Sequence, residues 1–201
     1  MAETGAPDDD TLRGLPDTFT YSEARRSGLS ERRLYRLRDD GVIEVLGRGL
    51  FRRTDIGTLA DADLSGIVRR APRATLCLVS ALARHGLTDE IPSTVDVALP
   101  RGTYRPVLQA PVTWHLFDPE TFEIGRGTQK IDDQTFIGLY DAPRSIIDAA
   151  RMRHREGSEL AYGALKRWLK QRGSSPAELL AMARHFPHAE RSLREALEIL
   201  L

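Results

Sequence analysis

Apolar residues recur with two different periods along the chain, and these periods predict where helices and strands form. Near the N-terminus, segments 21–27 and 31–40 carry a helical pattern and are separated by Gly28. Segments 42–45 and 50–53 are instead rich in β-branched and apolar residues, which is typical of strands. We therefore predict two helices followed by a β-hairpin in the N-terminal part.

Local signals mark the ends of the two predicted helices. Thr20 and Glu23 have the spacing of a capping box, in which each residue satisfies a backbone N–H of the other. Ser30 is suited to the N-cap of the second helix, and Gly41 to the left-handed position after its end. These caps favour two short, separate helices.

The hairpin is predicted from its turn. Gly47 and Gly49 flank Arg48, and glycines at these positions allow a tight turn with the arginine at its tip. Two helices joined by a glycine turn and followed by a hairpin form a winged helix-turn-helix. We assign residues 18–55 to such a module.

The remaining residues, 56–201, predict a larger mixed α/β domain that ends in helices, so the chain as a whole is expected to be α+β. Its helices are expected at about 60–70, 76–86, from Pro143, from Ser158, from Pro176 and at about 189–201, and its strands at 93–100, Val112–Phe117, Phe122–Ile124 and Phe136–Leu139.

Charge is unevenly distributed, although the formal net charge of the 201 residues is zero. Residues 1–17 contain five carboxylates and one arginine, and we expect them to form a flexible acidic tail. Residues 18–53 contain nine arginines against five carboxylates. A positive excess on one folded module would attract a polyanion such as DNA.

Helical spacing separates the side chains of the second helix into two faces. Leu34 and Leu37 lie on one stripe and are expected to be buried. Arg32, Tyr35 and Arg36 lie on the opposite face and are our candidates for contacts with base edges. The residues expected to contact phosphates are Ser30, Arg33, Arg52 and Arg53, with Arg48 expected at a minor groove or the DNA backbone.

An arginine-rich helix by itself has a second interpretation. Its arginines could form a solvated face or pair with Glu31, Asp39 and Asp40. Arg38 lies closer to the buried stripe, and we expect it to serve the fold. The capped helix pair together with the arginine-tipped hairpin favours double-stranded DNA as the partner.

Several kinds of chemistry find no support in the sequence. No nucleotide-binding glycine loop occurs, and the single cysteine, Cys77, excludes a disulfide framework or a multi-cysteine zinc site. No apolar run is long enough to span a membrane, and the N-terminus lacks the pattern of a secretory signal, so we expect a cytoplasmic protein. The five histidines are scattered. We expect no metal site, no cofactor and no enzymatic activity.

The sequence contains residues that could serve two enzymatic alternatives. Asp96, Asp141 and Asp148 would suit a metal-dependent nuclease, but they lack the paired spacing of a metal site, and we interpret them as strand-exposed or helix-capping carboxylates. Arg144 and Asp148 are also spaced for an i,i+4 ion pair. His85, Ser80 and Asp96 could form a nucleophilic triad, but no nucleophile-elbow glycines surround the serine.

Four stretches occur in an order that resembles one protein family. They are SERRLYRLRDDGVIEVLGRGLFRR, SALARHGL, VDVALPRG and DAPRSIIDAAR. The chain resembles the AbiEi-type abortive-infection antitoxins over roughly residues 18–155. It differs before Thr20, where Gly14 and Pro16 interrupt the family's first helix, so we expect that helix to be short or missing.

The resemblance implies a bacterial antitoxin of a type IV toxin–antitoxin or phage-defence operon. Its winged helix would bind and repress its own promoter, and its C-terminal domain would counteract a nucleotidyltransferase-like toxin, directly or indirectly. The alternative is a stand-alone winged-helix regulator whose C-terminal domain senses a ligand. A nuclease is the third and least favoured interpretation.

Overall fold

The structure is a computed structural model that describes residues 11–12, 14–55, 59–132 and 135–201. Its contacts divide the chain into two compact units. The first unit comprises the described residues up to Pro72, together with Pro106–Ala110 and the described part of Lys130–Ile137. The second unit comprises Arg73–Arg105, Pro111–Gln129 and Gly138–Leu201. Helices and sheets occur in both, so the chain is α+β as predicted.

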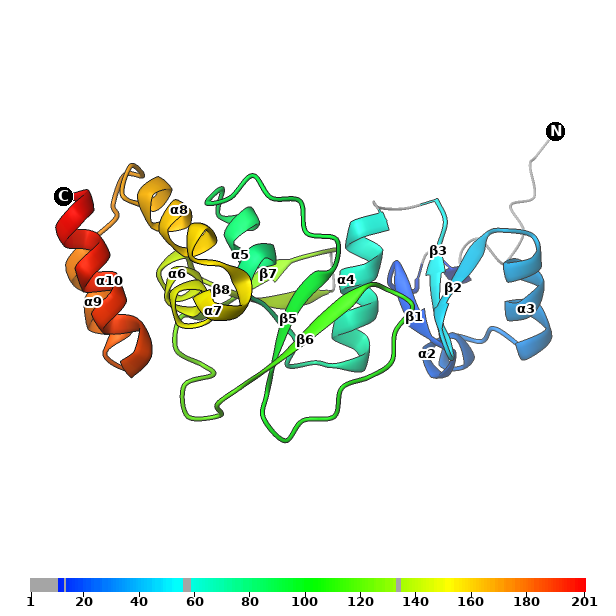
Figure 1. Cartoon of the computed structure of the whole chain (residues 1–201). Helices are drawn as coiled ribbons and strands as arrows, with labels where there is room; N and C mark the ends of the chain where they lie inside the picture. Colours follow the sequence, from blue (N-terminus) through cyan, green and yellow to red (C-terminus); the bar gives the residue numbers. More distant parts are fainter. Residues whose placement is uncertain (1–10, 13, 56–58, 133–134) are drawn as a thin grey trace. The chain divides into compact units, whose positions relative to one another are not determined.

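The first unit contains a three-stranded antiparallel sheet in the order β1-β3-β2 (Figure 1). Its elements in chain order are β1 (Thr18–Thr20), α2 (Tyr21–Arg26), α3 (Glu31–Asp39), β2 (Ile43–Gly47), β3 (Leu50–Arg53) and α4 (Leu59–Arg70).

The predicted caps of α2 and α3 are confirmed. The Thr20 hydroxyl accepts from the Glu23 N–H, and the Glu23 carboxylate accepts from the Thr20 N–H, which completes the capping box. The Ser30 hydroxyl accepts from the N–H of Arg33. Each cap contributes about 1 kcal/mol to helix stability. Gly41 follows α3 with a φ of 72°, as predicted.

One hydrophobic core holds this unit together. Leu34 and Leu37 of α3 are buried as predicted, and they share the core with Phe19 and Phe51, whose rings stack at 6.0 Å. Leu12 and Leu15 are also buried in this core. The expectation of a flexible tail is therefore wrong for these two leucines. Residues 1–10, the most acidic part of that tail, lie outside the described residues.

Helix α4 belongs to the first unit, whereas the sequence assigned its residues to the second part. It packs against β1, and a Cβ added at Gly66 would lie 3.4 Å from the Leu50 side chain. Arg69 donates to both carboxylate oxygens of Glu23 at 2.6 Å. The first unit thus continues beyond residue 55 and includes α4.

The second unit contains most of a five-stranded mixed sheet in the order β6-β5-β4-β8-β7 (Figure 1). Strand β4 runs antiparallel to β5 and parallel to β8, and β5 runs parallel to β6. The elements in chain order are β4 (Thr75–Leu76), α5 (Leu78–Arg84), β5 (Val95–Pro100), β6 (Val112–Phe117), β7 (Arg126–Lys130), β8 (Phe136–Tyr140), α6 (Ala142–Arg151), α7 (Arg153–Glu156), α8 (Ser158–Trp168), α9 (Pro176–Ala183) and α10 (Pro187–Leu200).

Most of these elements match the predicted ones, but β7 and α7 were not predicted, and two predicted elements differ from the structure. The predicted strand at Phe122–Ile124 is wrong, because this segment forms turns that lead into β7. The predicted helix at 76–86 begins later, since Thr75–Leu76 forms the short strand β4. Both segments are short and apolar, and periodicity distinguishes strands from other buried segments poorly at this length.

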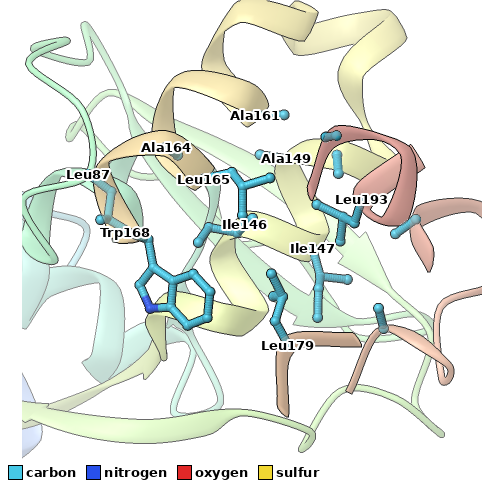
Figure 2. Close-up of a cluster of buried hydrophobic side chains, with 14 of the residues drawn as sticks. Leu87, Ile146, Ile147, Ala149, Ala161, Ala164, Leu165, Trp168, Leu179 and Leu193 are labelled. Atoms are coloured by element: carbon cyan, nitrogen blue, oxygen red, sulfur yellow. The ribbon is translucent and has the colours of Figure 1, made fainter. Parts of the chain in front are cut away.

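The helices of the second unit meet in a hydrophobic core (Figure 2). Helix α6 lies at its centre, where Ile146 and Ile147 are fully buried. Leu165 and Trp168 of α8 pack against them, together with Leu193 of α10. Because α6 contacts α5, α8, α9 and α10, its apolar face organises the whole helical part.

A buried charged cluster lies on α6. The side chains of Arg144 and Asp148 are both 0% exposed, and the Arg144 Nε donates to Asp148 Oδ2 at 3.0 Å, which confirms the predicted pair. Arg144 Nη1 also donates to the carbonyls of Thr121 and Ile124 at 2.7 and 2.5 Å. The guanidinium carbon lies 4.1 Å from the centre of the Tyr140 ring. This cluster connects α6 to the turns before β7.

Candidate nucleic-acid interface

The first unit presents α3 with most of its arginines exposed. Burial of Leu34 and Leu37 turns the opposite face of this nine-residue helix outward. Arg32 and Tyr35 lie on that face, and the Arg36 side chain is 81% exposed. The three predicted base-edge candidates therefore share one exposed surface.

The ion pair of Arg36 is weak. Its Nε lies 3.7 Å from Asp40 Oδ2, and both side chains are largely in solvent. An exposed i,i+4 pair of this kind contributes only about 0.3–0.5 kcal/mol. A phosphate or a base could therefore replace Asp40 at little cost.

The predicted phosphate residues Ser30 and Arg33 lie at the start of α3. The Ser30 hydroxyl is occupied by its capping bond to the Arg33 N–H at 3.3 Å. Both residues line a shallow hollow of about 420 Å³ whose other lining residues also belong to α3 and its C-cap. Arg33 is half-buried, in contrast to Arg32 and Arg36. Ser30 and Arg33 thus border the exposed arginine face.

Arg48 lies at the tip of the β2–β3 hairpin, as predicted. Gly49 beside it has a φ of 65°, a conformation that closes the turn and favours glycine. The Arg48 carbonyl accepts a hydrogen bond from Arg70 at the end of α4, while the Arg48 side chain is exposed. Helix α4 therefore holds the backbone of the hairpin tip.

Arg52 and Arg53 are not on this surface. Their side chains are only 7% and 10% exposed. Arg52 Nη1 donates to Glu44 Oε1 at 2.9 Å, and Arg53 Nη2 donates to Asp55 Oδ2 at 2.8 Å. The prediction that these two arginines contact phosphates does not fit this placement, and we leave them out of the proposed interface.

The reason for their burial is strand β1, which the sequence did not predict. The predicted hairpin has two strands, but β1 pairs with the other edge of β3 and makes β3 the central strand of a three-stranded sheet. Thr18 lies opposite Arg52 on one side, and Glu44 lies opposite it on the other. Directly opposed cross-strand residues interact, so the ion pair follows from this register.

Sequence reasoning missed Arg38. It was assigned to the fold, but its side chain is 41% exposed and its guanidinium carbon lies 4.9 Å from the centre of the Tyr35 ring. Arg38, Tyr35 and Arg48 line one groove of about 900 Å³ between α3 and the hairpin. Helical spacing alone could not predict that Arg38 lies beside the hairpin, because spacing within α3 does not show where β2 and β3 lie.

Arg69 and Arg70 of α4 line the same groove and were also missed. Arg69 is neutralised by Glu23. Burial acts to raise the pKa of the Glu23 carboxyl, but hydrogen bonds from Arg69 and Thr20 outweigh it, and the pKa is lowered from its usual value. The Arg–Arg sequence at the end of α4 was visible, but the sequence held no signal that it returns to the hairpin.

The residues of the enzymatic alternatives are engaged in other contacts. Asp96 Oδ1 pairs with His115 Nε2 at 2.9 Å, and Ser80 Oγ accepts from the backbone N–H of Asp96. His85 Nε2 lies 2.7 Å from the carbonyl of Tyr140. Ser80 and His85 are therefore not joined in a triad.

The remaining nuclease candidates have structural roles. Asp141 is the N-cap of α6, where its carboxylate accepts from the N–H of Arg144. Asp148 is buried between Arg144 and Arg151. Cys77 is fully buried, and burial raises the pKa of its thiol. Across the ranges given above, no three or more His, Cys, Asp or Glu side chains are grouped so that they could hold a metal ion.

No helix in the described part of the chain is both long and apolar enough to cross a membrane.

Comparison with known proteins supports the resemblance for the N-terminal module. Residues 10–54 match the family model AbiEi_4, described as "Transcriptional regulator, AbiEi antitoxin". The match covers α2, α3 and the hairpin, which are the elements that carry the exposed arginines. No curated protein matches the chain. The resemblance to AbiEi-type antitoxins is thus confirmed for residues 10–54, and the matching family model is described as a transcriptional regulator.

Proposed function

We propose that the chain is a DNA-binding antitoxin that represses its own toxin–antitoxin operon. One observation carries the DNA-binding part. The module that matches the antitoxin regulators presents Arg32, Arg36 and Arg48 in solvent, on α3 and on the hairpin tip. Exposed arginines on a recognition helix and a wing are suited to phosphates and base edges of one duplex.

The contacts are assigned as follows. Tyr35 and the arginines beside it on α3 enter the major groove, where arginine recognises guanine O6 and N7. Arg48 contacts the minor groove or the backbone beside it. Ser30 and Arg33 contact phosphates at the start of α3, which positions the helix without reading sequence.

The second part of the proposal concerns the toxin. The second unit lies outside the family match and has its own sheet and core, so it is suited to a separate task. We assign to it the neutralisation of a nucleotidyltransferase-like toxin in a type IV or phage-defence system. This step is supported by the order of the downstream stretches SALARHGL, VDVALPRG and DAPRSIIDAAR.

A mobility-shift assay tests the DNA-binding part. The probe is a duplex taken from the region upstream of the protein's own gene. Replacing Arg32, Arg36 and Arg48 by alanine should weaken binding strongly and reduce the slope of log affinity against log salt by about 0.9 for each phosphate contact that is lost. Unchanged affinity would overturn the DNA assignment.

A control variant keeps the same change in net charge. Arg184, Arg191 and Arg194 are exposed arginines of the second unit, with side chains 71%, 89% and 51% exposed. Their replacement by alanine should leave the salt slope unchanged. Equal losses in both triple variants would indicate a nonspecific effect of net charge and not an interface on α3.

A growth assay tests the toxin part. The adjacent gene is expressed together with the full chain from a foreign promoter, so that repression plays no role. The chain carrying the three α3 and hairpin substitutions should still protect the cells, because protection is assigned to the second unit. A neighbour unrelated to nucleotidyltransferases, with no protection, would instead favour the stand-alone regulator.

A further inference from the structure

Helix α3 presents Tyr35 between two different flanks. On the flank that faces the hairpin, Tyr35 and Arg38 line the groove of about 900 Å³ together with Arg48. On the other flank, Arg32 and Arg36 line the smaller hollow, to which no hairpin residue contributes. A duplex held by both α3 and the hairpin passes over the groove between them. Arg38 is therefore the arginine of α3 that faces the space between both contacts.

The guanidinium of Arg38 is held in place by its neighbours. Its Nε and Nη2 both donate to Asp39 Oδ1, at 2.9 and 2.6 Å. Its plane is also held near the Tyr35 ring, with 4.9 Å between the guanidinium carbon and the ring centre. An arginine fixed in this way loses less conformational entropy when it binds than a free one.

The remaining donors of Arg38 match one base. A guanidinium has five N–H donors, of which Asp39 occupies one on Nε and one on Nη2. The two N–H groups of Nη1 and the second N–H group of Nη2 are not bonded to Asp39. They lie along the edge of the guanidinium that joins Nη1 and Nη2. Such an edge matches the O6 and N7 acceptors of guanine in the major groove.

We propose that Arg38, oriented by Asp39 and Tyr35, recognises a guanine in the operator and is a specificity-determining residue of this protein. The inference rests on the proposed function, because it requires that α3 and the hairpin bind one duplex. Asp39 acts through Arg38 as a positioning residue. Its negative charge weakens binding to any DNA, while its contact with Arg38 sharpens the choice of sequence.

The experiment selects duplexes from a randomised library with the full chain. Dissociation constants are then measured for the selected duplex and for a scrambled duplex of equal composition. Arg38→Ala should weaken binding to the selected duplex by about 10- to 100-fold and abolish the preference for one G·C pair, with a much smaller loss on the scrambled duplex. Arg38→Lys should keep the affinity for the scrambled duplex but lose that preference.

Two further variants separate reading from charge. Arg33→Ala should weaken binding to both duplexes by similar factors, as expected for the phosphate contact assigned to it. Asp39→Ala should strengthen binding to the scrambled duplex, because it removes a negative charge, yet reduce the ratio between the duplexes. Thermal unfolding of each variant shows whether the module remains folded.

The outcomes distinguish the two proposals. If Arg38→Lys keeps the preference for that G·C pair, Arg38 contributes charge alone and the guanine assignment is wrong. The same conclusion follows if Arg38→Ala weakens binding to both duplexes equally. If the wild-type chain binds neither duplex, the proposed DNA-binding function fails, and this inference fails with it. Retention of the same selected base by Arg38→Ala overturns only the role of Arg38.

Discussion

Two arginine–aspartate pairs with the same sequence spacing occur in opposite environments. Arg36 and Asp40 on α3 are 81% and 59% exposed and lie 3.7 Å apart. Arg144 and Asp148 on α6 are fully buried and form a hydrogen bond of 3.0 Å. In each pair, the arginine and the aspartate are separated by one helical turn, so their spacing along the helix does not distinguish the two pairs.

The difference shows how burial assigns a role to a charged side chain. The exposed pair is screened by water and holds Arg36 weakly, which leaves it available for a partner. The buried pair has lost its hydration, and removal of Asp148 would leave the Arg144 charge buried without a carboxylate. The first pair is thus suited to binding and the second to holding the fold together.

The largest expected effect follows from breaking the buried pair. Asp148→Ala should lower the free energy of unfolding of the second unit by about 3–5 kcal/mol, because Arg144 would remain buried without its carboxylate. Urea unfolding followed by tryptophan fluorescence measures this, since Trp114 and Trp168 both belong to the second unit.

The exposed pair provides the matched control. Asp40→Ala should change the stability of the first unit by no more than about 0.5 kcal/mol, measured by circular dichroism. Comparable losses in Asp148→Ala and Asp40→Ala would show that burial does not separate the two pairs.

A second prediction probes the packing around Arg144. Gly125 has a φ of 69°, and a Cβ there would lie 2.6 Å from the Arg144 Cβ. Gly86 has a φ of 68° with nothing within 4 Å of its added Cβ. Gly125→Ala should therefore destabilise the second unit by about 1–3 kcal/mol more than Gly86→Ala, which carries the backbone strain alone. Equal thermal unfolding of the two variants would argue against tight packing at Arg144.

A third prediction separates stability from binding within the first unit. Arg52→Ala should lower stability by about 1–2 kcal/mol, because Glu44 loses its partner, while DNA affinity of the folded protein stays nearly unchanged. Arg36→Ala should do the reverse: stability stays nearly unchanged, while DNA affinity falls because a base contact is lost. Anisotropy titrations at several salt concentrations, well below the unfolding temperature, measure the DNA affinity and the salt slope of both variants. Urea unfolding measures their stability. A reduced slope in Arg52→Ala would return this arginine to the interface.

The smallest effect is expected at Glu23, whose side chain is 27% exposed and therefore intermediate between the two pairs. Its pKa is lowered in the folded state, so its stabilising effect is present above the unfolded pKa and is lost as the pH falls through the folded value. Glu23→Gln should cost roughly 1 kcal/mol at pH 7 and progressively less toward pH 3. Urea unfolding at several pH values measures this, and a loss independent of pH would argue against the ionised contact with Arg69.

Local features of the fold were predictable because they depend on neighbouring residues. The capping box at Thr20, the Ser30 cap and the turn at Gly49 each need only three or four consecutive positions. The N-cap at Asp141 and the ion pair between Arg144 and Asp148 also depend on residues three or four positions apart. Such signals survive folding because the same backbone groups need partners in any environment.

Features that depend on distant segments were predicted less well. The burial of Arg52 and Arg53 depends on β1, a three-residue strand too short to show a period. The exposure of Arg38 beside the hairpin depends on where β2 and β3 lie relative to α3. The place of α4 in the first unit depends on contacts with β1 and Glu23, far away in the sequence.

By itself, the sequence determined that this protein has a winged helix with an arginine-rich second helix, because helical period, caps and glycine turns are local properties. It also determined the type of residue available for DNA. Only the tertiary structure decided which arginines reach solvent, because burial depends on segments that meet after folding. Arg36 and Arg38 remain outside, whereas Arg52 and Arg144 are enclosed, although all four are the same residue beside a carboxylate.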